Sequence, residues 1–125
     1  MTSRRWIVDG MNVIGSRPTG WWRDRPGAMR DLVEELDEFA GREGDEVKVV
    51  FDGRCLDLDS SRVGVSFASR RGPNAADDDI AELVASDAEP ATLSVVTSDS
   101  DLARRVRERG AAVVGAGEFR RRLDG

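Results

Sequence analysis

Apolar and polar residues alternate along the chain in blocks that predict strands and helices in turn. Five short apolar runs predict buried strands, at residues 5–9, 47–51, 63–68, 93–97 and 112–114. Most of these runs are continuously apolar, which is typical of strands covered on both faces. The run at 63–68 instead alternates, with Val63, Val65 and Phe67 on one side.

Amphipathic segments between these runs predict helices, at residues 28–40, 75–85, 101–109 and 118–123. In the first, Met29, Leu32, Val33 and Leu36 recur at the i, i+3, i+4, i+7 spacing of a buried helix face. Residues 13–27 contain three glycines and two prolines, a density of breakers that predicts a long loop. Residues 53–62 have no clear pattern, and residues 69–74 predict a basic turn.

This alternation of strands and helices predicts an α/β fold with a mostly parallel central sheet and right-handed crossovers. The chain has 125 residues, of which 39% are apolar. That length suits one hydrophobic core, and no internal repeat or linker divides it. We therefore expect a single domain over residues 1–125.

Three of the predicted strands end in an aspartate. Asp9, Asp52 and Asp99 each follow an apolar run directly or within two residues. Each alone fits a turn, and Asp99 also fits a helix cap. Together they predict a shared site, because ligands of parallel α/β sheets bind at the carboxyl ends of the strands. Clustered carboxylates repel one another unless a cation or a proton is shared, so the pattern indicates a divalent-metal site.

A further acidic group opens the helix predicted at residues 75–85. At ~100° per residue, Asp77 falls on the buried stripe that continues through Ile80. Asp78 points nearly opposite, and Asp79 lies at the margin of the stripe. An acid on an apolar stripe is costly to bury without a partner, so Asp77 is the fourth expected ligand. Compensation of the helix dipole is an alternative explanation for Asp78 and Asp79.

Two other polar residues have open assignments. Asn12 follows Asp9 by three residues and fits either a turn or an amide that holds a carboxylate or phosphate. Asp101 fits either an outer metal ligand or the cap of the helix that begins there.

Composition excludes several kinds of chemistry. The chain has no histidine, which excludes an imidazole base and the usual zinc ligands. Cys55 is the single cysteine, so no intramolecular disulfide and no thiolate metal cluster can form. No apolar segment is long enough to span a membrane, and no signal-peptide core precedes the first strand. We expect a soluble, cytoplasmic protein with no membrane partner.

The formal net charge of −5 weakly disfavours nucleic-acid binding. However, eighteen of the nineteen basic residues are arginines, whose planar fork suits phosphate. Tryptophans beside arginines can stack bases and contact phosphates of a single strand. Candidate RNA-binding residues are Arg17, Trp21, Trp22, Arg23, Arg25, Arg70 and Arg71. The alternatives are a loop folded back over the core by its tryptophans and a solvated basic turn.

Four motifs, in this order, carry a resemblance to a known family. They are Asp9-Gly-Met-Asn, Phe51-Asp52-Gly53, Ala76-Asp77-Asp78-Asp79-Ile80 and Thr97-Ser98-Asp99-Ser100-Asp101-Leu102. Together they resemble the NYN domain, a branch of the PIN-like nucleases, and most closely the bacterial YacP-like ribonucleases. The resemblance covers nearly the whole chain.

The resemblance implies a three-layer α/β/α sandwich with strand order 3-2-1-4-5. It also implies hydrolysis of RNA phosphodiester bonds, as an endoribonuclease, with one or two Mg²⁺ or Mn²⁺ ions. By motif position, the catalytic acids are Asp9, Asp77 and Asp99. The residues in support are Asp52, Asp78, Asp101 and Asn12. The run of three aspartates leaves the choice between Asp77 and Asp78 open, and the oligomeric state and a ribosome or another RNA-processing protein as partner stay open too.

The metal chemistry is consistent with these residues, because Mg²⁺ prefers carboxylates and retained waters and needs no histidine. An acyl-phosphate phosphatase of the haloacid dehalogenase type requires a second aspartate at the position of Met11. A receiver domain requires a late lysine, and residues 97–125 contain none. The remaining alternative is a non-catalytic RNA- or protein-binding module of the same fold.

Overall fold

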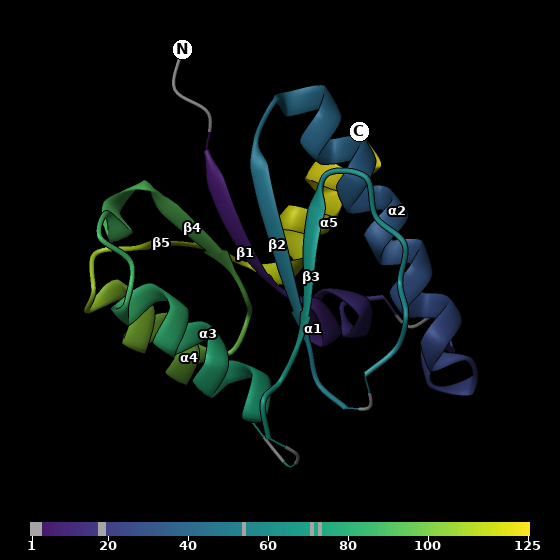
Figure 1. Ribbon diagram of the computed structural model, residues 1–125, viewed down its shortest axis with the longest axis horizontal. Coiled ribbons are helices and arrows are strands. Elements are labelled where there is room, and N and C mark those ends of the chain that lie inside the picture. The colour runs from purple at the N-terminus through teal and green to yellow at the C-terminus, as the bar shows by residue number, and fades with distance from the viewer. Residues whose placement is uncertain (1–3, 18–19, 54, 71, 73) are drawn as a thin grey trace.

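The computed structural model describes residues 4–17, 20–53, 55–70, 72 and 74–125. Its centre is a five-stranded sheet in the order β3-β2-β1-β4-β5 (Figure 1). The strands are β1 (Arg5–Asp9), β2 (Glu46–Phe51), β3 (Val63–Phe67), β4 (Leu93–Val96) and β5 (Ala112–Val114). Every neighbouring pair is parallel, which confirms the predicted α/β class and strand order.

In the described part of the chain, five α-helices cover the two faces of this sheet (Figure 1). They are α1 (Gly10–Gly15), α2 (Arg25–Glu43), α3 (Ala75–Ala85), α4 (Ser100–Arg107) and α5 (Ala116–Asp124). Helices α1, α2 and α5 pack on one face around Val8, Val49 and Phe119. Helices α3 and α4 pack on the other around Ile7, Val95 and Ile80. The result is the expected α/β/α sandwich.

An aromatic cluster stabilises the thicker of these two layers. The ring of Trp6 lies 5.6 Å from that of Phe39 and 5.2 Å from that of Phe119, and Phe39 and Phe119 are themselves 5.2 Å apart. The indole N–H of Trp6 donates to Asp45 at 2.9 Å, so its polar atom is satisfied. This cluster joins β1, α2 and α5, and it attaches the C-terminal helix to the sheet.

The prediction of a long loop over residues 13–27 is wrong for much of this range. Helix α1 starts directly after β1 at Gly10, a 3₁₀ helix spans Trp21–Arg23, and α2 begins at Arg25. Asp24 caps α2 by accepting the N–H of Gly27 at 3.1 Å. Pro26 falls in the first turn, where backbone N–H groups have no partner within the helix. The missing N–H of proline therefore costs no hydrogen bond there, and proline is favoured. It therefore starts the helix instead of interrupting it.

Gly10 explains how α1 can follow β1 without a linker. A Cβ on this residue would lie 2.5 Å from the ring of Phe51 and 3.0 Å from Val49. Only a glycine lets the helix start this close to the neighbouring strand β2. As a result, α1 begins at the carboxyl edge of the sheet, between the ends of β1 and β2. No helix among the described residues is long and apolar enough to cross a membrane.

Candidate functional site: an acidic pocket at the carboxyl edge of the sheet

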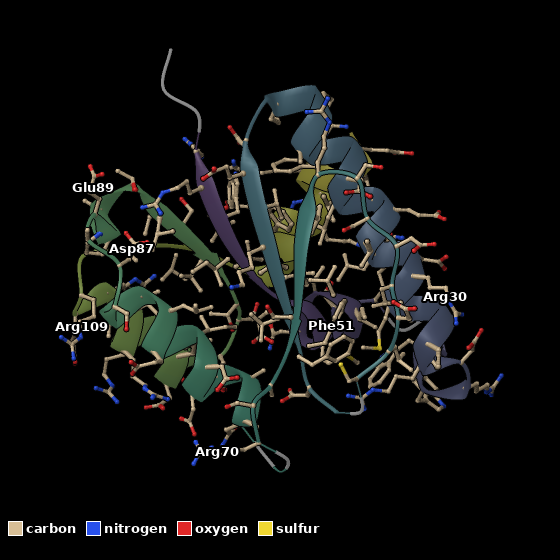
Figure 2. All side chains as sticks on the ribbon, viewed as in Figure 1. Arg30, Phe51, Arg70, Asp87, Glu89 and Arg109 are labelled. Carbon is tan, nitrogen blue, oxygen red and sulfur yellow. The ribbon has the colours of Figure 1, made fainter. Side chains whose placement is uncertain are left out.

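A pocket of about 230 Å³ opens at the carboxyl ends of the parallel strands. Four aspartates and an asparagine predicted from the sequence line it: Asp9, Asn12, Asp52, Asp77 and Asp99. Met11 and Asn74 complete the wall. The pocket lies near Phe51, the last residue of β2, which Figure 2 labels close to α1. We call the cavity lined by these four aspartates the acidic pocket.

Asp9 is the most buried of the four, with 4% of its surface exposed. It ends β1, the central strand of the sheet, and accepts a hydrogen bond from the Thr97 hydroxyl at 3.0 Å. Burial raises the pKa of Asp9 to about 7, and the charges of Asp77 and Asp52 add to the rise. Hydrogen bonds from the Thr97 hydroxyl and from the backbone N–H of Asn12 oppose it. Around neutral pH, Asp9 is thus divided between its protonated and ionised forms.

Asp77 is oriented into the pocket by the first turn of α3. Burial raises the pKa of Asp77 to about 6, with the charges of Asp99 and Asp52 adding to the rise. The nearby guanidinium of Arg105 opposes it. The raised pKa values of Asp9 and Asp77 have the same main causes, which are burial and the negative charges of neighbouring aspartates.

Asp52 and Asp99 are held by backbone amides. Asp52 follows β2, and its Oδ1 accepts the N–H of Ala76 at the start of α3 at 2.9 Å. Asp99 caps α4, and its Oδ1 accepts the N–H of Leu102 at 2.9 Å. Each bond uses one carboxylate oxygen, so one oxygen of each residue has no hydrogen bond within the described part of the chain. The cap predicted for Asp99 and its place at the pocket are therefore compatible.

Two polar residues connect the ends of β1 and β4. The Thr97 hydroxyl donates to Asp9 and also accepts the N–H of Asp99 at 3.1 Å. The Asn12 side-chain oxygen accepts the N–H of Ser98 at 2.8 Å. This bond orients the amide and leaves its nitrogen to donate toward the pocket. Thr97 was not among the residues expected from sequence, and its position between a buried strand and Asp99 is the signal that could have found it.

The structure does not bring Asp78 or Asp101 to the acidic pocket. Asp78 binds Arg70 at 2.6 Å and Arg105 at 3.0 Å, and it lines a separate cavity between α3 and α4. Asp101 pairs with Arg104 at 2.7 Å on the exposed side of α4. Both were expected as metal ligands, and neither lines the pocket that holds the other four aspartates. In each case the turn of the helix directs the side chain away from the carboxyl edge.

The donor set of the pocket suits a hard divalent cation, because it consists of carboxylate and amide oxygens. Among the residues that the structure describes, however, no three His, Cys, Asp or Glu side chains are grouped closely enough to hold a metal ion. Backbone and hydroxyl donors hold Asp9, Asp52 and Asp99 individually. The pocket thus fits Mg²⁺ or Mn²⁺ in chemistry, and ion binding requires its carboxylates to approach one another.

The expected RNA-binding residues lie in different places. Arg25 donates to the backbone oxygen of Asp52 at 3.1 Å and lies against Gly53, at the rim of the acidic pocket. Trp22 is 59% exposed, whereas Trp21 is half-buried against the core. Arg17 pairs with Asp124 at the end of α5. The side chain of Arg23 is exposed.

The basic turn before α3 is described only in part. Arg70 lies in the described part and pairs with Asp78, whereas Arg71 lies outside the described residues. Arg25 is thus the exposed candidate that contacts the backbone of a pocket residue, and Trp22 is the candidate with the most exposed ring.

Comparisons with known proteins agree with the fold and with the motifs. The family model described as the YacP-like NYN domain matches residues 6–125. The structure of a point mutant of Rae1 (YacP) from Bacillus subtilis superposes with a TM-score of 0.82 at 27% identity, covering 97% of this chain and 75% of that one. A second crystal structure of Rae1 (YacP) from the same organism gives a TM-score of 0.79 at 26% identity, covering 99% and 74%. Comparison with curated proteins gave no match.

Proposed function

The chain belongs to the YacP-like NYN domain family, within the PIN-like nucleases, and we propose that it is a metal-dependent endoribonuclease. The observation that carries this proposal is the acidic pocket, in which four aspartates from separate elements face one space at the carboxyl edge of the sheet. Two of them, Asp9 and Asp77, have pKa values raised by burial and by the charges of neighbouring aspartates. A divalent cation is the countercharge that would relieve this repulsion.

In this proposal Asp9, Asp52, Asp77 and Asp99 hold Mg²⁺ or Mn²⁺. The chemistry that a bound cation supplies is to acidify a water molecule and to offset charge on the scissile phosphate. A bound cation would favour the ionised forms of Asp9 and Asp77 and so oppose the rise in their pKa values that burial and neighbouring carboxylates cause. The nitrogen of Asn12, oriented by Ser98, can donate to a phosphate oxygen.

Arg25 and Trp22 supply the proposed contact to the RNA strand. Arg25 has no carboxylate partner within the described residues, so its charge is free to bind a phosphate beside Asp52. Trp22 exposes a ring on which a base can stack, which is worth about 1–3 kcal/mol per base in single-strand binding proteins. A ribosome or another RNA-processing protein as a further partner stays a prediction.

The test is cleavage of an end-labelled, mixed-sequence RNA with Mn²⁺, Mg²⁺ or EDTA. We expect internal cuts with either metal, none in EDTA, and none with the Asp9→Asn variant. Asp59→Asn is a matched control, because Asp59 is exposed and lies outside the pocket. Loss of cutting in Asp9→Asn but not in Asp59→Asn assigns the chemistry to the acidic pocket instead of to net charge.

The second candidate is a non-catalytic RNA- or protein-binding module, and the separate fixation of the carboxylates by backbone donors is the observation that favours it. RNA retained in a gel shift without cleavage under any metal would select this module. If the protein neither cut nor retained RNA, a protein-binding role would replace both. Cutting that persists in EDTA would refute the metal-dependent mechanism.

A further inference from the structure

The three consecutive aspartates at the start of α3 make three different sets of contacts. Asp77 lines the acidic pocket. Asp78 accepts Nη2 of Arg70 at 2.6 Å and Nη1 of Arg105 at 3.0 Å. Asp79 accepts the N–H and the hydroxyl of Ser69 at 2.6 and 2.8 Å. The rotation of ~100° per residue along a helix separates these contacts, so only one of the three aspartates faces the pocket.

Helix α3 begins without an ordinary side-chain cap. Asn74 occupies the capping position in the left-handed region, with φ of 63°, and its side chain makes no capping hydrogen bond. The first backbone N–H groups of a helix have no partner within it, so an uncapped first turn opens readily. Here Ala76 donates to Asp52 and Ala75 donates to the Gly72 carbonyl at 3.3 Å, and the contacts of Asp78 and Asp79 attach this turn further to its surroundings.

The contacts of Asp78 join the parts of the chain that position the pocket on this side. Arg70 lies in the turn before α3, at the lower end of the molecule in Figure 2. Arg105 belongs to α4, the helix whose N-terminus is capped by Asp99. Asp77 and Asp99 are thus carried by two helices that the contact between Asp78 and Arg105 links directly.

This link acts against a force that would separate the two helix starts. Asp52, Asp77 and Asp99 line one pocket, so their like charges repel one another. Arg105 is oriented by Asp78, since its Nη1 donates to the Asp78 carboxylate. The same guanidinium therefore fixes the helix pair and lowers the electrostatic cost of keeping Asp77 in the pocket.

We propose that Asp78 is a positioning residue and not a metal ligand, and that its bridge to Arg70 and Arg105 holds Asp77 in the acidic pocket. This inference rests on the proposed function, in which Asp77 binds the cation. It assigns the two adjacent aspartates of the motif to different tasks. It also adds Arg105, which had no assigned role, to the residues that shape the site.

The experiment compares Asp78→Asn, Arg105→Gln and the double variant with Asp77→Asn in the full chain. Arg105→Lys is a conservative variant that keeps the charge. Arg104→Gln is the matched control, because Arg104 is a neighbouring arginine of α4 that pairs with Asp101 and Glu108 on the exposed surface. Three quantities are measured: amide hydrogen exchange over residues 74–80 without metal or RNA, Mn²⁺ binding by calorimetry, and kcat and KM for RNA cleavage.

We expect faster exchange over residues 74–80 in Asp78→Asn and Arg105→Gln, with the melting temperature nearly unchanged because exposed ion pairs add little global stability. We expect kcat to fall by about 10–100-fold, as for residues that orient metal ligands, with KM within about twofold. The double variant should lose no more than Asp78→Asn, because that single variant already removes the contact to Arg105. Arg105→Lys should restore part of kcat, and Mn²⁺ should still bind at the wild-type stoichiometry.

Two results would overturn the positioning role. Loss of Mn²⁺ binding in Asp78→Asn, as in Asp77→Asn, would make Asp78 a ligand. Exchange and kcat equal to those of Arg104→Gln would make the bridge a surface ion pair without consequence. Failure of the proposed function is distinguishable, because wild-type protein would then neither bind Mn²⁺ nor cut RNA. In that case the exchange of residues 74–80 still decides whether the bridge orders the start of α3.

Discussion

Replacing Asp9 by asparagine should stabilise the metal-free protein at alkaline pH, although it removes a proposed catalytic group. An aspartate in an unfolded chain has a pKa of about 3.9, whereas the pKa of Asp9 in the folded protein is about 7. Ionising Asp9 in the folded state therefore costs on the order of 4 kcal/mol relative to the unfolded chain. Asparagine is similar in shape and carries no charge.

The sign of the pH dependence follows from proton binding. Because the folded pKa is raised, the folded state binds more protons than the unfolded state between about pH 4 and pH 7. The stability that this provides is fully present below about pH 4 and is lost as the pH rises through about 7. Between pH 5.5 and pH 8, Asp9 alone should lower the free energy of unfolding by about 2 kcal/mol.

The Asp9→Asn variant would not recover the full free-energy cost of ionising Asp9, because an amide has one accepting oxygen where the carboxylate has two. The new side chain can still accept from the Thr97 hydroxyl, and its nitrogen then faces the other donor. We expect Asp9→Asn to be more stable than wild type by about 1–3 kcal/mol at pH 8, allowing about 1 kcal/mol for the lost hydrogen bond. The two proteins should be about equal at pH 5.5.

The assay is urea unfolding followed by tryptophan fluorescence, in EDTA, at pH 5.5 and pH 8. Asp59→Asn, an exposed aspartate outside the pocket, corrects for the change in net charge. Addition of Mn²⁺ at pH 8 should stabilise wild type and not Asp9→Asn, since only the wild-type pocket gains a countercharge. A variant less stable than wild type at pH 8, or a pH slope equal to that of wild type, would refute the argument from burial and repulsion.

Three further predictions concern the support of the pocket. Thr97→Val should destabilise the protein by about 1–3 kcal/mol in urea unfolding, because it leaves a buried oxygen of Asp9 without its donor; an unchanged midpoint would contradict this. Gly10→Ala should cost about 1–3 kcal/mol by forcing the Phe51 ring aside, with Gly15→Ala, which meets no neighbour, as its control in thermal melts. Asp99→Ala should cost about 1 kcal/mol through loss of the α4 cap, whereas Asp99→Asn should keep helix stability while cleavage is lost; equal stability losses would exclude the cap.

The sequence was sufficient to predict the five strands, because most of them are short continuous apolar runs and three of them are followed by an aspartate. It was insufficient for the connection after β1. Helix α1 spans six residues with a glycine at each end, which reads as a loop when judged by helix propensity. The reason for Gly10 is the ring of Phe51 on β2, a contact that no local pattern contains. Pro26 counts as a breaker by residue type alone, although Asp24 two residues earlier is available as a cap.

The same limit applies to the acidic residues. The convergence of strand ends predicted that Asp9, Asp52 and Asp99 share one edge, and the helical wheel predicted that Asp77 faces them; all four line the pocket. Asp78 and Asp101 were included among the expected metal ligands because of their positions in the motifs. Their arginine partners, Arg105 and Arg104, could not be inferred without knowing which face of each helix these side chains occupy. Topology thus determines which strand ends meet, while the rotation of each helix determines which of several adjacent acids points inward.

The hydrogen bonds of the pocket also explain how its carboxylates are held close together despite their repulsion. Each carboxylate at a strand end is bound by a donor that the fold supplies regardless of any ligand: the Thr97 hydroxyl for Asp9, the Ala76 N–H for Asp52 and the Leu102 N–H for Asp99. Two of these donors are amides at helix starts, where N–H groups have no partner within the helix. The repulsion that raises two pKa values is therefore partly offset by backbone dipoles that themselves need acceptors. The start of α3 beside Asp52 and the start of α4 at Asp99 thus help this chain to concentrate negative charge at one edge and remain folded before any cation binds.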